Sequence, residues 1–303
     1  MKDKILHFNL YFGLGVFAVA VISLALQFPF MKTWFFCFAW WSLILILDSV
    51  NFRRMQTSLL ARPIGYVLST ALFSVFIWLI FELFNLRLNN WTYHRLPQSI
   101  LARWLGYLVA FASVIPALQE LAQLFQSFFR QSTGFFRICV TSGLLRVSLL
   151  LGGASIILAL LWPEIFFPLT WLCFILLFEP LNFIHKNASL LDDLERPDAR
   201  RLYSWLLSGF TAGLLWELFN FWAGSHWEYH LHYFDFLKVF QMPLFGYGGF
   251  LFFGLECFVV LSVFDSLSRK RKIQASGKII VLLGLCIFYS ACFFLIDTLT
   301  WVR

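Results

Sequence analysis

The stretch from Ile64 to His94, IGYVLSTALFSVFIWLIFELFNLRLNNWTYH, decides how this chain must fold. Its first part is an apolar run, and about 20 such residues in a helix cross the roughly 30 Å hydrocarbon core of a bilayer. Glu82 and Asn85 interrupt the run near its end, and the aromatic segment Trp91-Thr-Tyr-His94 follows. A carboxylate in a membrane-crossing helix is costly, so this arrangement needs a reason.

The same arrangement recurs later in the chain. Glu217-Leu-Phe-Asn220 repeats the acid and the amide, and Trp227-Glu-Tyr-His230 repeats the aromatic segment. Such self-similarity in one order predicts two copies of one helical unit.

Further matches extend the repeat in both directions. Glu120 lies as far beyond Trp91 as Glu256 lies beyond Trp227, which predicts that these two glutamates are equivalent. Upstream, Asp48 and Asn51 match Glu179 and Asn182, since each pair is an acid followed three residues later by an amide. The predicted repeat therefore covers four helices in each half.

Nine apolar segments run along the chain. They span residues 9–28, 34–52, 64–86, 104–125, 144–162, 168–183, 202–223, 243–264 and 278–301. The first exceeds the length of a signal peptide and has no small-residue cleavage site, so we expect it to be retained as a helix.

These segments predict an all-α membrane protein with about nine transmembrane helices. The first repeat is expected in residues 1–140, the second in 141–266, and a basic linker with the ninth helix in 267–303. A unit of four crossings returns to its starting side, so the two repeats are parallel and related by an axis along the membrane normal.

The composition agrees with a membrane protein and excludes several classes of function. Hydrophobic residues make up 60% of the chain and charged residues only 13%, whereas a soluble domain has about a quarter of its residues charged. The net charge of +7 does not form one basic face, so no nucleic-acid partner is expected. No nucleotide-binding or serine-hydrolase motif is present, and no cofactor is expected.

The positions of Lys and Arg predict the orientation. Most of the 23 basic residues lie in connections on the side of the N-terminus, and the exceptions are Lys32, Arg87, Arg95, Arg103, Lys238 and Arg303. Basic connections stay in the cytoplasm. We therefore expect an integral protein of a cytoplasmic membrane, such as a bacterial inner membrane, with its N-terminus inside. The six cysteines contain no C-x-x-C pair and are expected to be buried and unpaired.

Two interpretations of the intramembrane acids remain open. Asn and Glu can hydrogen-bond across helix contacts and only hold helices together. Alternatively, the acids surround a cavity and move protons, which the number of acids favours. The acids are Asp48, Glu82, Glu120, Glu179, Glu217 and Glu256.

The histidines near the second aromatic segment raise the possibility of a metal site. His226, His230 and His232 have a spacing that can bind zinc or copper if the segment is helical. The first repeat keeps only His94 of this set. We therefore favour a hydrogen-bonding role for His94 and His230 and expect no metal.

The second half resembles the membrane-integral lycopene cyclase domain family. The resemblance rests on Trp216-Glu217, Trp227-x-Tyr229, Pro243 and Phe252-Phe253, although Leu-Phe-Gly follows Pro243 where that family has paired glutamates. It implies a duplicated helical unit and an enzyme that cyclises or isomerises an isoprenoid or carotenoid-like lipid by carboxylic acid and base chemistry. The partners it implies are this substrate and membrane lipids.

The resemblance and the repeat together give the expected site. Glu217, Glu82, Glu256 and Glu120 are the expected catalytic acids. Residues expected to bind or orient the substrate are Asn220, Asn85, Trp227, Tyr229, His230, Trp91, Tyr93, His94, Glu179 and Asp48. The alternatives are a transporter or binding subunit with a polar site at the repeat interface, or a membrane assembly factor.

Overall fold

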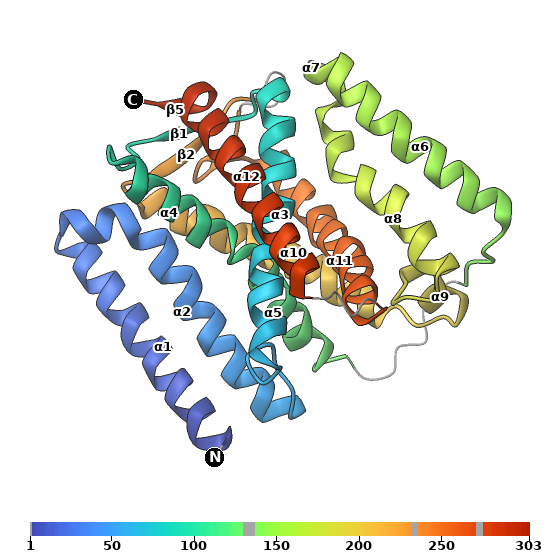
Figure 1. Cartoon of the computed structure of the whole chain (residues 1–303), viewed down its shortest axis with the longest axis horizontal. Coiled ribbons are helices and arrows are strands. Elements are labelled where there is room, and N and C mark those ends of the chain that lie inside the picture. Colours follow the sequence, from blue (N-terminus) through green and yellow to red (C-terminus); the bar gives the residue numbers. More distant parts are fainter. Residues whose placement is uncertain (1, 130–136, 232–235, 271–274) are drawn as a thin grey trace.

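The computed structural model describes residues 2–129, 137–231, 236–270 and 275–303 and is predominantly helical (Figure 1). Its helices are α1 (Lys2–Ala25), α2 (Pro29–Met55), α3 (Ile64–Leu88), α4 (Ile100–Phe111), α5 (Val114–Gln126), α6 (Ser142–Leu161), α7 (Pro163–Phe166), η1 (Phe167–Trp171), α8 (Cys173–Ile184), α9 (Leu190–Glu195), α10 (Arg200–Trp222), η2 (Leu244–Gly246), α11 (Tyr247–Lys270) and α12 (Ala275–Leu299). The strands are β1 (Trp91–His94), β2 (His226–Tyr229), β3 (Lys238–Val239), β4 (Met242–Pro243) and β5 (Trp301–Val302).

Eight helical stretches among the described residues are long and apolar enough to span a membrane. α10 takes the place of the seventh expected segment, residues 202–223, and is not among these eight stretches; it carries Arg200, Arg201 and Glu217. One expected span is divided into α4 and α5, and another begins as η1 before α8. The predicted all-α membrane fold is confirmed, and the orientation in the cell stays a prediction.

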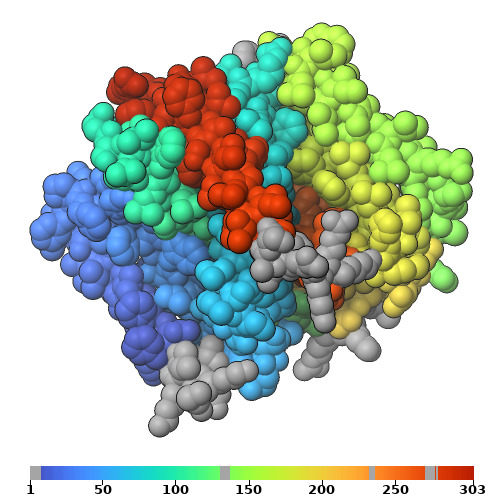
Figure 2. Space-filling model, in the orientation of Figure 1, coloured from blue at the N-terminus to red at the C-terminus, as the bar shows by residue number. Residues whose placement is uncertain are grey.

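The helices pack in the same way in the two halves. α1 packs on α2 and α2 on α5, just as α6 packs on α8 and α8 on α11. The α1–α2 pair and the α6–α8 pair lie on opposite sides of the molecule in Figure 1. The extra helix α12 packs on α3 and crosses the face seen in Figure 2, between the two pairs.

A small sheet joins the two halves. β1 pairs antiparallel with β2 on one side and parallel with β5 on the other. Trp91 lies opposite Tyr229, and Tyr93 lies opposite Trp227. Each tryptophan thus lies opposite the tyrosine of the other repeat. A two-fold axis through the centre of the strand pair produces this register.

The sheet has one aromatic and one polar face, because successive side chains in a strand point to opposite sides. Trp91 and Tyr93 belong to the hydrophobic core, and Trp227 and Tyr229 pack against it. The sheet lies at the end of the molecule that is opposite the N-terminus, close to the C-terminus (Figure 1). We call this end the sheet end.

The cysteines follow their expectation in part. All six are free, and Cys173, Cys257 and Cys292 are buried, but Cys139 and Cys286 are exposed. Cys286 lies on the outer surface of α12. In a membrane this surface contacts lipid, so an apolar side chain can be exposed there. His232 lies outside the described residues, and so do three of the basic residues that were counted on the N-terminal side, Arg130, Arg271 and Lys272.

Candidate site between the two repeats

Asn85 and Asn220, which occupy the same position in the two repeats, hold the aromatic segments in place. Asn85 donates from Nδ2 to the carbonyl of Trp91 at 2.8 Å and accepts the Trp91 N–H at 3.1 Å. Asn220 makes the same pair of bonds with Trp227, at 2.8 and 2.9 Å. α3 ends with Asn89 in the left-handed conformation, which Asn tolerates better than most residues, and the chain then turns back toward Asn85.

The first acid of each repeat accepts a hydrogen bond from a tyrosine of its own strand. The Tyr93 hydroxyl donates to Glu82 Oε1 at 2.5 Å, and the Tyr229 hydroxyl donates to Glu217 Oε1 at 3.0 Å. Burial, together with the negative charge of Glu82, raises the pKa of Tyr93 well above its ordinary value. Tyr93 therefore remains a neutral phenol and can act as the donor.

The two acids differ in their other partners. Glu82 Oε1 also accepts the indole N–H groups of Trp78 at 2.8 Å and Trp91 at 3.2 Å. The residue that corresponds to Trp78 in the second repeat is Gly213, where an added Cβ would collide with the Phe250 ring. The duplicated unit has therefore kept two tyrosine–glutamate pairs but has only one tryptophan at this position.

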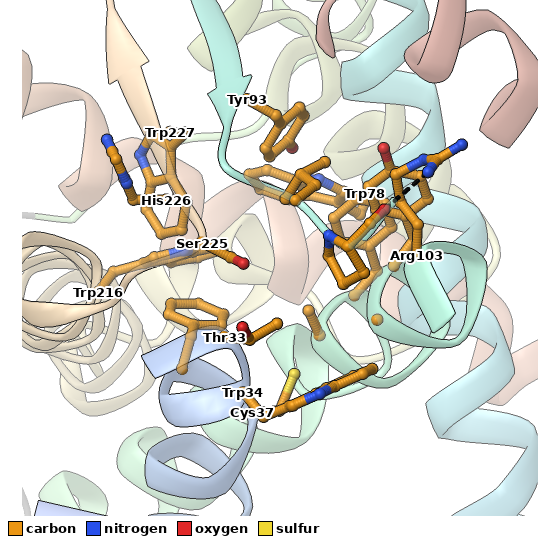
Figure 3. A pocket seen from close by; sticks show the side chains of 17 residues that line it. Thr33, Trp34, Cys37, Trp78, Tyr93, Arg103, Trp216, Ser225, His226 and Trp227 are labelled. Carbon is orange, nitrogen blue, oxygen red and sulfur yellow. Dashed lines mark hydrogen bonds between the residues drawn. The ribbon is translucent and has the colours of Figure 1, made fainter. Parts of the chain in front are cut away.

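A cavity of about 90 Å³ lies beneath the sheet, between helices of both repeats (Figure 3). Trp78, Trp216 and Trp227 contribute its aromatic walls, and Tyr93 contributes a phenol. We call it the central cavity. A smaller space of about 30 Å³ shares these four side chains and also borders Tyr229. Neither Glu82 nor Glu217 belongs to the lining, so the acids meet this region through their tyrosines.

The central cavity has polar groups that the sequence did not single out. Arg103 of α4 lines it and is bound to Asp297 of α12 by two hydrogen bonds, of 2.6 and 2.7 Å. Asp297 also accepts the hydroxyl of Tyr107 at 2.9 Å and the indole N–H of Trp104 at 3.0 Å. Arg103 and Asp297 are both buried. Asp297 and Tyr107 thus form a second pair of a carboxylate and a phenol, and the Tyr107 ring lies beside that of Tyr93, which belongs to the first such pair.

One signal in the sequence pointed to this pair. Asp297 stands as a lone acid inside the last apolar segment, and a lone intramembrane acid calls for a partner. No spacing rule connects positions so far apart in the chain, so Arg103 could not be named from sequence. Thr33, Cys37 and Ser225 also border the central cavity and were not named (Figure 3).

Asp48 and Glu120 lie together at the other end of the first repeat. Asp48 Oδ1 accepts the Leu60 N–H at 2.7 Å, and Glu120 Oε1 accepts the Leu59 N–H at 2.7 Å. Asn51 Nδ2 donates to Glu120 Oε2 at 2.5 Å. These groups fix the connection between α2 and α3, and neither acid lines the central cavity.

Glu179 does the same for the second repeat. Its Oε1 accepts the Ser189 hydroxyl at 2.5 Å and the Leu191 N–H at 3.0 Å, which fixes the connection after α8. The predicted equivalence of Asp48 and Glu179 therefore extends to their contacts, since each binds the N–H of the residue twelve positions later. The expected substrate-binding role of these two acids has no support in their surroundings.

Glu256 does not correspond to Glu120 in space. Asn51 donates to the carbonyl of Glu120, whereas its counterpart Asn182 donates to the carbonyl of Val259. Glu256 instead accepts the Phe174 N–H at 3.1 Å, near the start of α8. The equivalence of the two glutamates predicted from the sequence therefore does not extend to their contacts.

The histidines occupy the polar face of the sheet. The rings of His94 and His226 stack with centroids 5.6 Å apart, and Glu228 lies 3.2 Å from His226 Nε2 and 3.8 Å from His94 Nε2. The Thr92 hydroxyl links His94 and His230, at 3.0 and 2.9 Å. The segment is a strand and not the helix that the metal interpretation required.

The electrostatics of this face follow from burial and from these contacts. Partial burial lowers the pKa of His94, although the nearby Glu228 opposes the shift. Burial disfavours ionised Glu228, but the hydrogen bond from His226 and the neighbouring imidazoles outweigh this and lower its pKa. Across the described parts of the chain, no three His, Cys, Asp or Glu residues are arranged to hold a metal ion.

Comparison with known proteins gives no assignment for this site. No family model, no curated protein and no solved structure matches the chain.

Proposed function

We propose that this protein is an integral membrane enzyme that transfers a proton to or from the apolar end of a lipid-soluble, isoprenoid-like molecule held in the central cavity. One observation carries the proposal. Tyr93 borders a cavity with aromatic walls between the repeats, and its hydroxyl is hydrogen-bonded to a buried carboxyl group, that of Glu82. The resemblance of Trp216-Glu217 and Trp227-x-Tyr229 to the lycopene cyclase pattern supplies the isoprenoid class of the molecule.

The tyrosine and the acid together form a two-step proton path. A C–H bond of the bound molecule breaks, its proton goes to the Tyr93 oxygen, and the Tyr93 proton moves to Glu82 Oε1. The products are a neutral phenol, a neutral carboxylic acid and a molecule with a new C=C bond in place of a cationic centre. The reverse sequence protonates an alkene, so one pair serves both halves of an isomerisation.

The walls suit the cation that such a reaction forms. Aromatic faces attract a cation within about 6 Å of the ring centroid. Trp78 and Trp216 have ring centroids 5.0 Å apart and come from different repeats, so the two repeats together form one continuous aromatic wall of the cavity.

Size and access favour the end of a chain over a large headgroup. The central cavity is smaller than the roughly 150 Å³ apolar cavity that admits benzene in a well-studied protein. An apolar groove of about 500 Å³ between α1, α2 and α4 shares Trp34 and Cys37 with it. These two side chains therefore separate the central cavity from a surface that faces lipid, and their movement would admit a chain.

A membrane binding subunit or assembly factor is the second candidate. Its support is the structural use of Asp48, Glu120, Glu179 and Glu256, each of which accepts a backbone N–H and stabilises a connection or helix contact. In that case Glu82 and Glu217 would also only hold the strands in place.

Deuterium exchange separates the two candidates. The purified protein in nanodiscs is incubated in D₂O with the polyisoprenoid fraction of its expression host, and the lipids are analysed by mass spectrometry. We expect deuterium at a terminal isoprene unit, and we expect Tyr93→Phe and Glu82→Gln to slow its incorporation by about 10²–10⁴-fold, the usual contribution of a general acid or base.

Tyr289→Phe is the matched control, because it removes another buried phenol, one that donates to the Leu72 carbonyl outside the central cavity. This variant should exchange at the normal rate. If Tyr93→Phe exchanged deuterium at the normal rate, the proposed proton path through Tyr93 would be wrong. A bound isoprenoid that never exchanges, even in the unaltered protein, would favour the binding subunit.

A further inference from the structure

A second hollow on the surface combines an apolar wall with two cations. It is a groove of about 760 Å³ between α1, α2 and α10. Val21 and Leu24 of α1 and Leu218 and Trp222 of α10 line it, and Lys32 and Arg95 contribute to its lining at the sheet end. It shares only Thr33 with the central cavity.

The two cations are brought together by the segment that leads into β2. The Gly224 N–H donates to the Lys32 carbonyl at 2.8 Å, and the Ser225 hydroxyl donates to the Arg95 carbonyl at 2.9 Å. An added Cβ at Gly224 would lie only 3.0 Å from the Lys32 Cβ, so this approach depends on a glycine. The backbones of both cationic residues are thus fixed side by side.

Their charges lack a protein partner. Within the described ranges, neither Lys32 nor Arg95 lies within ion-pair distance of an acid. Basic residues are scarce at the sheet end, and the buried one, Arg103, is bound to Asp297. Two unpaired cations from separate elements at one groove therefore indicate an anionic ligand.

The apolar part of the groove selects the kind of anion. Val21 and Trp222 are exposed; Val21 lies on α1, which is long and apolar enough to span a membrane, and Trp222 lies on α10, which packs against α5 and α11. A free phosphate or nucleotide would leave this wall uncovered, whereas an acyl chain covers it and places its headgroup at the membrane surface, where basic residues attract anionic lipids.

We infer that this groove binds a phospholipid with an anionic headgroup, with its phosphate at Lys32 and Arg95 and an acyl chain between α1 and α10. The site is separate from the central cavity, so the inference does not depend on the proposed enzymatic activity.

Lipid retention measured by native mass spectrometry tests the inference. The protein is released from nanodiscs that contain equal amounts of phosphatidylglycerol and phosphatidylcholine, and the bound lipid is identified. We expect retained phosphatidylglycerol, and we expect the double variant Lys32→Gln/Arg95→Gln to retain at least tenfold less of it. The matched control is Arg87→Gln/Arg303→Gln, which removes two other cations predicted for the same side and should retain the normal amount.

A steric variant tests the position of the acyl chain without changing charge. Val21→Trp fills the groove from an exposed position on α1 and should lower retention to a similar extent. Equal retention of both lipids by the unaltered protein, or normal phosphatidylglycerol retention in the double variant, would overturn the inference. Normal retention in Val21→Trp alone would overturn the placement in this groove.

Discussion

Asn85 and Asn220 show how a single amide can position an aromatic strand. Each uses both ends of its side chain on the backbone of one tryptophan, and Asn85 also accepts the Asn90 N–H at 2.9 Å. A buried backbone group that loses its partner is costly, so these asparagines are needed for the sheet to form at all, whatever the sheet then does.

Asn85→Ala is expected to lower the free energy of unfolding by about 2–4 kcal/mol, because it leaves buried polar groups of Asn90 and Trp91 unsatisfied. Denaturation of the protein in detergent micelles, followed by tryptophan fluorescence, measures the loss. Gln98→Ala, at an exposed position before α4, serves as the control. If both variants unfold at the same denaturant concentration, the amide does not hold the strand.

Residue types and spacing predicted part of the site. The sequence pointed to Glu82, Asn85, Trp91 and Tyr93 as one group, and hydrogen bonds join them in space. The grouping was accessible because these residues are near in sequence and recur in the second repeat. Trp78 lies one turn before Glu82 on α3, so helix geometry brings the two side chains together. The second repeat lacks this hydrogen bond because Gly213 stands at the position of Trp78.

At the scale of elements, glycines let α10 and α11 approach each other closely. A Cβ on Gly254 would collide with the Trp205 carbonyl and with the backbone of Gly209 on the facing helix. Small residues that allow such an approach replace the hydrophobic effect as a source of helix association in a bilayer, because lipid tails are as apolar as the side chains.

Gly254→Ala should therefore destabilise the protein by about 1–3 kcal/mol, the usual cost of overpacking a close contact. Gly248→Ala, in the same helix, has no neighbour within 4 Å of the added Cβ and should be neutral or stabilising by up to about 1 kcal/mol. Thermal unfolding of the two variants in the same detergent measures the difference. A destabilisation of equal size in both would show that the cost comes from the helix itself and not from the packing.

The same scale explains the failed equivalence of Glu120 and Glu256. The two acids keep the same distance in sequence from their aromatic segments, but α4 and α5 are separate helices, whereas α11 is one helix. A sequence offset locates a side chain correctly only where the elements along the way are the same, and β3, β4 and η2 lie between β2 and α11, whereas β1 leads directly to α4. By its contact with the asparagine, the counterpart of Glu120 is Val259.

For the whole molecule, the buried ion pair of Arg103 and Asp297 is one of the contacts that join the extra helix to the first repeat. Besides its two hydrogen bonds, the Arg103 guanidinium lies 4.0 Å from the centroid of the ring of Trp301, the first residue of β5. Tyr93 N–H donates to the Thr300 carbonyl at 2.8 Å, so the same region ties the C-terminus to β1. α12 thus holds Arg103 and Tyr107, two residues that line the central cavity.

Arg103→Leu or Asp297→Leu alone should destabilise the protein by about 3–5 kcal/mol, because each leaves a buried charge unpaired. The double variant should be more stable than either single variant, since both charges are gone. A double-mutant cycle of unfolding free energies in detergent measures the coupling. Additive losses would mean that the two residues stabilise the protein independently.

The sequence by itself determined the helical membrane fold and the recurrence of an acid, an amide and an aromatic segment in each half. These depend on hydrophobicity and on spacing within a helix, which are local properties. The tertiary structure alone decided which acids stand beside the central cavity, which only fix connections, and that Arg103 meets Asp297. Those outcomes depend on how helices distant in sequence pack, and packing in lipid is governed by close contacts and buried hydrogen bonds that no periodicity encodes.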